Sequence, residues 1–351
     1  MPLFVESCSS AVALQSANCI TVGLVNNRPD AVFEATERQF RDLVRSAASD
    51  TVVLLKLFSN PQVPRGATAR EAMAGRYHDI AALWDAPLDG LIVTGAEPHA
   101  ARLADEPCWE TFASLTDWAR DHTASTIWSG LAAHAAVQHA DGIERFPLAE
   151  KRCGVFEVRL LSEHPMTWHL PQPFRVPHSR CHDLPDAELK AAGYQILTGS
   201  PAAGVDAFAK QDGSFFLFFQ GHPEYEPDTL LREYRNDVAG FLAHERERYP
   251  ATPFGYFDDD ARLLAESFRR RALAERRSAL IAEFPEARLQ GGVACPWRSA
   301  AVGFYEKWLA FLAARKAERR TIAVSQMQPV RLRRTWRDWP LEVFRGAERR
   351  H

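Results

Sequence analysis

The sequence has no long apolar run, no paired cysteine motif and no strong excess of charge of either sign. No stretch approaches the ~18 consecutive apolar residues of a membrane span. The N-terminal segment MPLFVESCSSAVALQ also lacks the charged start and long apolar centre of a secretory signal peptide. These absences predict a cytoplasmic protein with no membrane partner.

The few cysteines and the balanced charge exclude further classes of partner. The 6 cysteines are scattered and form no C-x-x-C pair, so neither a zinc site nor a disulfide framework is predicted. The formal net charge of −3 gives no electrostatic footprint for nucleic acid. We therefore expect small-molecule partners, no nucleic acid and no metal, with a homodimer left open.

Apolar strand patterns alternate with helical patterns through the first 140 residues. The strand patterns lie at 20–25, 51–58, 90–94 and 125–129, and the helical patterns at 29–44, 77–85, 107–122 and 130–140. Such alternation predicts βαβ units and a parallel sheet covered on both faces. After Gly142 the pattern becomes typical of a mixed or antiparallel extension, followed by a helix near 228–246. The predicted fold class is α/β, with a mostly parallel sheet flanked by helices.

From Pro250 onward the chain reads as helical and basic. We predict an α/β domain over 1–250 and a helical, basic C-terminal extension over 251–351 packed on the same domain. The final segment RLRRTWRDWPLEVFRGAERRH mixes Arg with Trp, a composition that suits bases and phosphates. We interpret this segment instead as a solvated tail or a strap packed by its tryptophans.

The segment STIWSGLAAHAAV, residues 125–137, reads as a strand, a sharp turn and a helix. Enzymes that transfer acyl groups on α/β folds use this arrangement to present a nucleophile. The residue at the turn is Gly130, which accepts a positive φ but has no side chain. The nucleophile that such a turn normally carries is therefore missing.

A second chemical segment is SFFLFFQGHPEYEP, residues 214–227, where a buried strand pattern hands over to His222 and Glu224. Residues two apart point to the same side of an extended backbone. A carboxylate beside an imidazole fixes its tautomer and keeps it basic, as a general base requires. The alternative is a structural histidine at a strand end.

Two weaker signals lie between these segments. PHSRCHD, residues 177–183, gathers Ser179 and Arg180 among other polar residues, and an arginine can hold a carboxylate with two hydrogen bonds. A hydrogen-bonded loop is the alternative for this cluster. Lys151, in LAEKRCG, is a weak signal by itself.

Seven motifs occur in the order typical of one known family: LVNNRPDAVFEATERQF, DGLIVTGAEP, STIWSGLAAHAAV, EKRCGVF, PHSR, GHPEYEPDTLLREY and PWRSAAVGFYEKWL. Over roughly residues 20–312 the chain resembles the homoserine O-succinyltransferase family. The resemblance implies a fold similar to class I glutamine amidotransferases, and O-acylation of homoserine for methionine biosynthesis. It implies acyl-CoA as co-substrate and no resident cofactor.

The resemblance also implies roles for single residues. His222 falls on the general base, Glu224 on its partner, and Lys151 and Ser179 on substrate-binding positions. His99 falls where the family tunes the choice of acyl group, and it matches neither the Gly associated with succinyl nor the Glu associated with acetyl.

Three positions depart from the family pattern. Gly130 stands at the position of the family's nucleophilic Cys. Asp30-Ala31 stands where some members carry a Lys, with Arg28 close by. Asn236 stands at the position of a substrate-binding Arg, with Arg235 adjacent. We expect Arg235 or Arg180 to hold the acceptor's carboxylate, because a planar bidentate donor suits that group.

Several interpretations of the missing nucleophile stay open. Ser129 replaces the Cys, or Cys181 acts as an alternative thiol, or His222 activates the acceptor for direct transfer without a covalent intermediate. A glutaminase-type amidotransferase subunit needs the same missing Cys. We predict an acyltransferase that moves a succinyl or acetyl group from acyl-CoA to a hydroxy-amino acid; the alternative is a catalytically degraded homologue that binds an amino acid or a partner.

Overall fold

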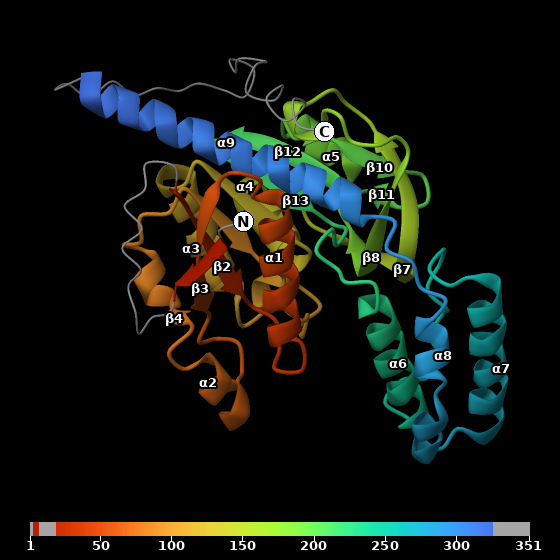
Figure 1. Ribbon diagram of the computed structural model, residues 1–351. Helices are drawn as coiled ribbons and strands as arrows, with labels where there is room; N and C mark the ends of the chain where they lie inside the picture. The colour runs from red at the N-terminus through yellow and green to blue at the C-terminus, as the bar shows by residue number, and fades with distance from the viewer. Residues whose placement is uncertain (1–2, 7–18, 326–351) are drawn as a thin grey trace.

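The computed structural model describes residues 3–6 and 19–325 of the chain, and the Arg- and Trp-rich segment at 331–351 lies outside this part. Within it, a large sheet has the strand order β1-β3-β2-β5-β6-β13-β12-β9, with β4 beside β3 (Figure 1). The strands are β1 (Leu3–Glu6), β2 (Cys19–Asn26), β3 (Val52–Ser59), β4 (His78–Asp79), β5 (Gly90–Val93), β6 (Ser125–Ser129), β9 (Gln195–Ile196), β12 (Ala207–Asp212) and β13 (Ser214–Phe219).

The strands from β1 to β13 in this order pair in parallel, whereas β12 and β9 continue the sheet antiparallel. All residues of β5, β6 and β13 are buried, which is typical of central strands with helices on both faces. The α/β fold class with a mixed edge is therefore confirmed.

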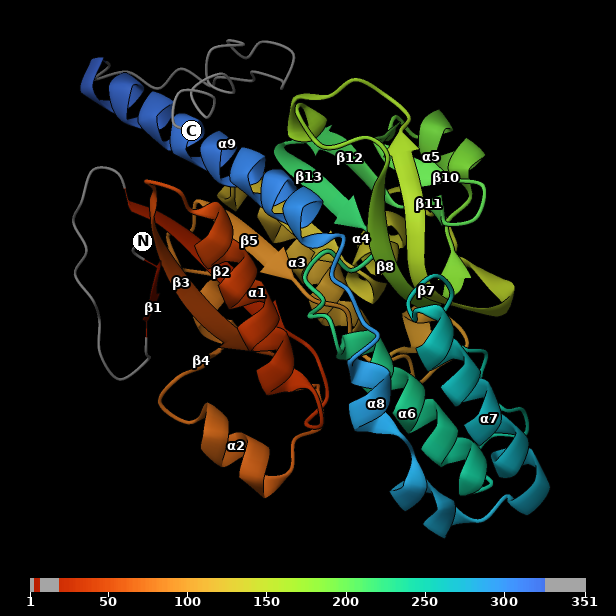
Figure 2. The same cartoon turned by 45° about the vertical axis from the view of Figure 1, so that its right-hand side comes forward.

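Helices cover both faces of the large sheet (Figure 2). Residues of α1 (Phe33–Ala47) and α9 (Arg298–Ser325) share one hydrophobic core with one face. Residues of α3 (Trp109–His122) and α4 (Leu131–Asp141) share a second core with the opposite face. The helices predicted at 29–44, 107–122 and 130–140 are present as α1, α3 and α4. The helix predicted at 77–85 is not.

The prediction of a helix at 77–85 was wrong. The structure has the short strand β4 there, followed by a single 3₁₀ turn at Ile80–Leu83, and the helix in this connection is α2 (Ala67–Met73). The 3₁₀ turn begins where Asp79 accepts a hydrogen bond from the backbone N–H of Ala81. Local capping therefore decided the structure of this segment.

The hydrophobic clusters cross residue 250. A third cluster joins α6 (Thr229–Leu242) with α7 (Asp259–Glu275) and α8 (Glu286–Gln290). Farther along the chain, Trp308 of α9 is fully buried and its Nε1–H donates to Ser125 Oγ at 2.9 Å. The later helices thus have two roles. Helices α6–α8 pack together as a lobe, whereas α9 completes the hydrophobic core on one face of the large sheet.

A smaller antiparallel sheet has the order β11-β10-β7-β8, with α5 (Asp186–Ala191) following β8. Its strands are β7 (Phe146–Leu160), β8 (Phe174–Asp183), β10 (Thr198–Ser200) and β11 (Gly204–Val205). The polar cluster PHSRCHD lies within β8, so the alternative of a hydrogen-bonded loop was wrong. Pairing with β7 supplies its backbone hydrogen bonds.

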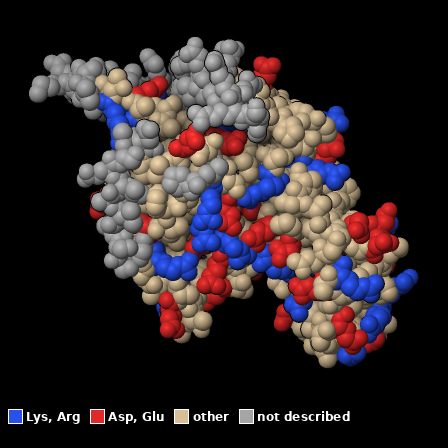
Figure 3. Space-filling model, viewed as in Figure 1, with Lys and Arg blue, Asp and Glu red and all other residues tan. Residues whose placement is uncertain are grey.

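The carboxyl ends of the parallel strands meet at one edge of the large sheet. Helix α2 follows β3 and helix α6 follows β13, and both lie at the lower edge in Figure 1. Figure 3 shows the surface indented between them, with acidic and basic side chains interspersed over this face. In open α/β sheets, ligands bind at this edge. None of the described helices has the length and apolar character needed to cross a bilayer.

Candidate active site

The turn between β6 and α4 has the sharp conformation expected from the sequence. Gly130 has φ 58° and ψ −122°, and its N–H donates to the carbonyl of Phe219 at 2.9 Å. A side-chain carbon built on Gly130 would lie 3.3 Å from Cε1 and 3.9 Å from Nε2 of His222. The position without a side chain therefore faces an imidazole.

His222 and Glu224 lie together as the extended GHPEY pairing predicts. Nδ1 of His222 is 2.8 Å from Oε1 of Glu224, and the imidazole stacks on Tyr225 with ring centroids 4.3 Å apart. The backbone N–H of His222 donates to the carbonyl of Pro177 in β8. When Nδ1–H donates to the carboxylate, Nε2 keeps a lone pair directed toward the Gly130 side of the ring.

Beside this pair lies a carboxylate that the sequence analysis missed. Glu233 of α6 accepts hydrogen bonds from the hydroxyls of Ser179 and Tyr225, the latter at 2.6 Å. Burial raises the pKa of Glu233, but the charge of Lys151 and these two hydrogen bonds outweigh it and hold the pKa below its usual value. Glu233 is therefore an anion at neutral pH.

A signal for Glu233 was present in the sequence. The buried face of α6 includes Leu230, Tyr234 and Val238, and Glu233 lies one turn after Leu230 on that side of the helix. A carboxylate beside the buried face of an amphipathic helix is a candidate functional group because its burial needs specific partners.

Lys151 and Ser179 come from neighbouring strands, β7 and β8, and meet at Glu233. Nζ of Lys151 lies 2.9 Å from Asp237 and 3.9 Å from Glu233. Burial lowers the pKa of Lys151, but the carboxylates around it raise the pKa above its usual value. The structure thus places both predicted substrate-binding residues in one charged cluster next to His222.

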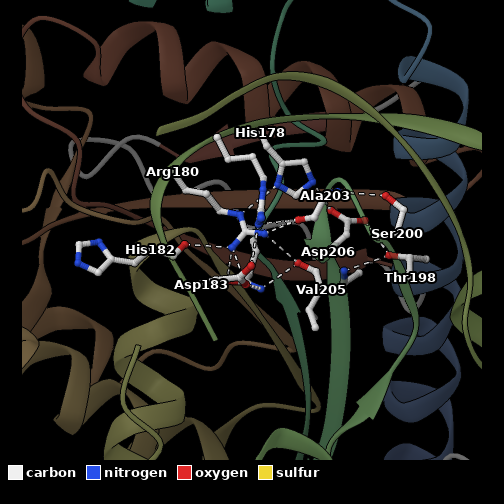
Figure 4. Close-up of polar contacts among 12 residues, drawn as sticks. His178, Arg180, His182, Asp183, Thr198, Ser200, Ala203, Val205 and Asp206 are labelled. Atoms are coloured by element: carbon white, nitrogen blue, oxygen red, sulfur yellow. Dashed lines mark hydrogen bonds and ion pairs between the residues drawn. The ribbon is translucent and has the colours of Figure 1, made fainter. Parts of the chain in front are cut away.

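Arg180 does not face this cluster with free donors. It is buried, and its guanidinium binds Asp183 at 2.6 Å, the side-chain oxygen of Gln220 and the carbonyls of Ala203 and Val205 (Figure 4). The carboxylate that Arg180 holds is the protein's own. Because Gln220 lies two residues before His222, this network supports the strand end that carries the imidazole.

The other predicted substrate-binding residues lie at the periphery. Arg235 pairs with Glu286 at 3.1 Å on the surface of the helical lobe, and Asn236 is exposed, three residues after Glu233 on α6. His99 is exposed in the loop after β5, where its backbone N–H donates to the buried carboxylate of Glu106. That carboxylate fixes the backbone and leaves the imidazole of His99 in solvent.

The two candidates for a replacement nucleophile, Ser129 and Cys181, lie less favourably than a side chain at position 130 would, because that position faces His222. Ser129 is the buried last residue of β6, and by strand alternation it shares a face with Ile127, which packs in the core containing α1 and α9. Cys181 is an exposed free thiol on β8. Neither observation brings a nucleophilic atom to the imidazole.

The start of α4 offers hydrogen-bond donors beside Gly130. The first N–H groups of a helix have no intrahelical acceptor. Gly95, in the loop after β5, approaches this start so closely that a side-chain carbon on it would lie 2.6 Å from the backbone nitrogen of Leu131. Glycine at position 95 therefore keeps the donors accessible. In the described residues, no cluster of His, Cys, Asp or Glu has the arrangement of a metal site.

Comparison with known proteins adds independent findings. The profile of a family described as homoserine O-succinyltransferase matches residues 3–319. The homoserine O-succinyltransferase of Rhodopseudomonas palustris is 46% identical over 307 residues, which are 88% of this chain and 92% of that protein. The protein of the same name from Methylorubrum extorquens is 45% identical over 298 residues, 85% of this chain and 88% of that protein.

Solved structures similar to this chain include a glutamine amidotransferase from Thermotoga maritima and a glutamine amido transferase from Methylobacillus flagellatus. The first is 11% identical with a TM-score of 0.44 and covers 84% of this chain and 98% of its own. The second is 14% identical with a TM-score of 0.45 and covers 84% and 96%.

Proposed function

Since the chain belongs to the homoserine O-succinyltransferase family, an acyltransferase family, we propose that it transfers an acyl group from acyl-CoA to the hydroxyl of homoserine or a related hydroxy-amino acid. We place this reaction in methionine biosynthesis in the cytoplasm. The observation that carries the mechanism is the His222–Glu224 pair facing a Gly130 with no side chain.

The proposed transfer is direct. Nε2 of His222 accepts the proton of the acceptor hydroxyl, and the hydroxyl oxygen attacks the carbonyl carbon of the thioester. The tetrahedral intermediate then expels the CoA thiolate, which takes the proton from the His222 imidazolium, so the products are the O-acyl amino acid and CoA thiol. Glu224 stabilises that imidazolium through Nδ1–H. Holding both substrates together supplies much of the remaining rate enhancement.

The start of α4 supports the same step. Negative charge develops on the carbonyl oxygen in the transition state, and backbone N–H groups at a helix N-terminus stabilise it. Leu131 provides the first of these groups, next to Gly95. Their position does not depend on a side chain at 130, so the loss of a nucleophile leaves this contribution intact.

The charged cluster around Glu233 suits the acceptor's ammonium group. A half-buried carboxylate held by two hydroxyls and a lysine keeps its charge, and a charge-assisted hydrogen bond to an ammonium is stronger than a neutral one. We assign Ser179 and Lys151 to positioning this carboxylate and the substrate. For the acyl group we propose succinyl, as in the name of the family. Acetyl stays as the alternative because His99 matches neither family pattern.

The test is mass spectrometry of products after incubation with succinyl-CoA or acetyl-CoA and a panel of hydroxy-amino acids that includes L-homoserine and L-serine. O-Acyl products formed without any acyl-enzyme adduct support direct transfer. An adduct mapped to Ser129 or Cys181 contradicts it and restores a displaced nucleophile. Binding of an amino acid with neither adduct nor turnover favours the second candidate, a binding or regulatory protein, which the three departures at residues 30–31, 130 and 236 support.

A further inference from the structure

A hydroxy-amino acid carries a carboxylate as well as an ammonium. The residues of the site described so far include no positively charged side chain that is free to bind this carboxylate. Arg180 binds Asp183 and Arg235 binds Glu286, so neither has its charge free for a ligand. Lys151 lies between Asp237 and Glu233. A carboxylate partner must therefore come from another element.

Arg28 lies at the carboxyl edge of the large sheet, two residues after the end of β2. Its backbone is held in place, because Arg65 donates from Nη1 to the carbonyl of Arg28 and from Nη2 to the carbonyl of Asn26. Asp30 accepts hydrogen bonds from Arg65 and from the backbone N–H of Gly66. The loop is fixed before any substrate arrives.

The side chain of Arg28 is half-buried and forms no ion pair with any residue in the described part of the chain. The surrounding arginines differ, since Arg38, Arg65 and Arg76 bind the carboxylates of Glu226, Asp30 and Glu37. Arg28 is thus a cation available to a ligand on an edge where its neighbours are paired.

Arg28 also lies on the side of the fold that carries the site. It precedes α1, and Arg38 of that helix pairs at 2.7 Å with Glu226, two residues after Glu224. Burial and the Glu233 carboxylate raise the pKa of the Tyr225 hydroxyl far above its usual value, and the charge of Arg28 opposes them. Tyr225 stacks on His222 with one side of its ring and hydrogen-bonds Glu233 with its hydroxyl. Glu233 and the imidazole of His222 therefore both contact Tyr225, and the charge of Arg28 acts on the same hydroxyl.

We propose that Arg28 binds the carboxylate of the acceptor amino acid, opposite Glu233 at the ammonium. This inference rests on the proposed function and identifies the acceptor as a zwitterionic α-amino acid. The planar guanidinium can bind a carboxylate with two parallel hydrogen bonds. The distal carboxylate of a succinyl group is the other source of the same chemistry, and the experiment separates the two.

Calorimetry without acyl donor tests the inference independently of turnover. L-Homoserine and its carboxamide, L-homoserine amide, are titrated into the wild-type protein and the Arg28→Ala, Arg28→Lys and Arg45→Ala variants. Arg45 is a surface arginine of α1 that pairs with Asp42 and serves as the matched control. We expect Arg28→Ala to weaken binding of L-homoserine at least ~10-fold, Arg28→Lys to weaken it less, and Arg45→Ala to leave it unchanged.

The amide isolates the carboxylate. Wild type should bind it more weakly than L-homoserine, and Arg28→Ala should no longer distinguish the two. Succinyl-CoA is titrated separately into the same proteins. Equal affinity of Arg28→Ala and wild type for L-homoserine would overturn the inference, as would an Arg28→Ala effect seen only in the succinyl-CoA titration. No binding of L-homoserine to wild type would overturn this inference and the proposed acceptor together. Arg28-dependent binding without acyl transfer would support this inference and overturn the proposed function.

Discussion

Gly130 and His222 face each other across the space that a nucleophilic side chain would occupy. A carbon placed on Gly130 lies 3.3 Å from Cε1 of the imidazole, so a side chain there would need the ring to shift by a few tenths of an ångström. The backbone of the turn keeps its sharp conformation although its residue carries nothing. The imidazole and the turn are thus arranged as nucleophilic catalysis requires, and in the proposed direct transfer the acceptor hydroxyl is the nucleophile.

Gly130→Cys should create a thiol that acyl-CoA can acylate. The thiol would lie beside His222, which can take its proton. The positive φ at this position should lower stability by about 1–3 kcal/mol. Intact-protein mass spectrometry measures the adduct and thermal unfolding measures the cost. Gly130→Ala is the matched control, because it has the same strain and no thiol; an adduct on this variant would show that acylation occurs elsewhere.

His222→Ala should abolish acyl transfer, with a loss of at least ~100-fold as expected when a general base is removed. Glu224→Gln should lose less, because an amide still orients the ring but does not stabilise the imidazolium. Initial rates of CoA release with each hydroxy-amino acid measure both effects. Full activity of His222→Ala would rule out its role as the base.

Glu233→Gln should raise the KM for the acceptor at least ~10-fold and change the KM for the acyl donor little, because it removes the charge that binds the ammonium. Ser179 and Tyr225 donate to different oxygens of Glu233. In the variant one hydroxyl can still donate to the amide oxygen and the other can accept from the amide N–H, so we expect the fold to persist. Glu286→Gln, at the exposed Arg235 pair, is the control. Equal increases for donor and acceptor would contradict the assignment of Glu233 to the ammonium.

Asp183→Asn should destabilise the protein at neutral pH by about 3 kcal/mol, because it leaves the buried Arg180 without its counter-charge. Burial raises the pKa of Asp183, but the charge of Arg180 and hydrogen bonds from Arg180, Arg152 and Gln220 together hold the pKa below its usual value. A depressed pKa contributes stability above the unfolded-state pKa and loses it as the pH falls through the folded-state pKa.

The difference between wild type and Asp183→Asn should therefore shrink as the pH falls below about 4. Urea unfolding at neutral and acidic pH measures it. Asp186→Asn, in an exposed pair with Lys190, should change stability by less than ~1 kcal/mol at either pH. A constant difference for Asp183→Asn at all pH values would show that its charge is not responsible.

The sequence predicted the large sheet well because its strands are buried on both faces. The runs GLIVT at 90–94 and STIWS at 125–129 carry no charge and have apolar or β-branched residues at their centres, and they coincide with β5 and β6. The helix expected at 77–85 was wrong because the segment is too short for its periodicity to be decisive, and only a single 3₁₀ turn follows the N-terminal cap at Asp79.

The site was predictable only in part. His222 and Glu224 are two residues apart, so local geometry brings them together and the sequence shows it. The sequence also indicated Arg180 as a binding residue for the acceptor's carboxylate. In the structure Arg180 instead forms an ion pair with Asp183, which lies at the end of the same strand. Glu233 and Arg28 are more than 200 residues apart in sequence, and no local pattern indicates that both charges act on the Tyr225 hydroxyl.

The late position of helix α9 in the sequence affects how the protein folds during synthesis. The strands it covers, β2 and β5, are made early in synthesis, whereas the helix that packs on them begins only at Arg298. Until then, one face of the sheet around Gly90 has no Trp308 or Leu312 against it, and its apolar surface is open to other chains. The nascent chain should therefore expose this apolar surface until α9 has been synthesised, and the packing on this face can be completed only then.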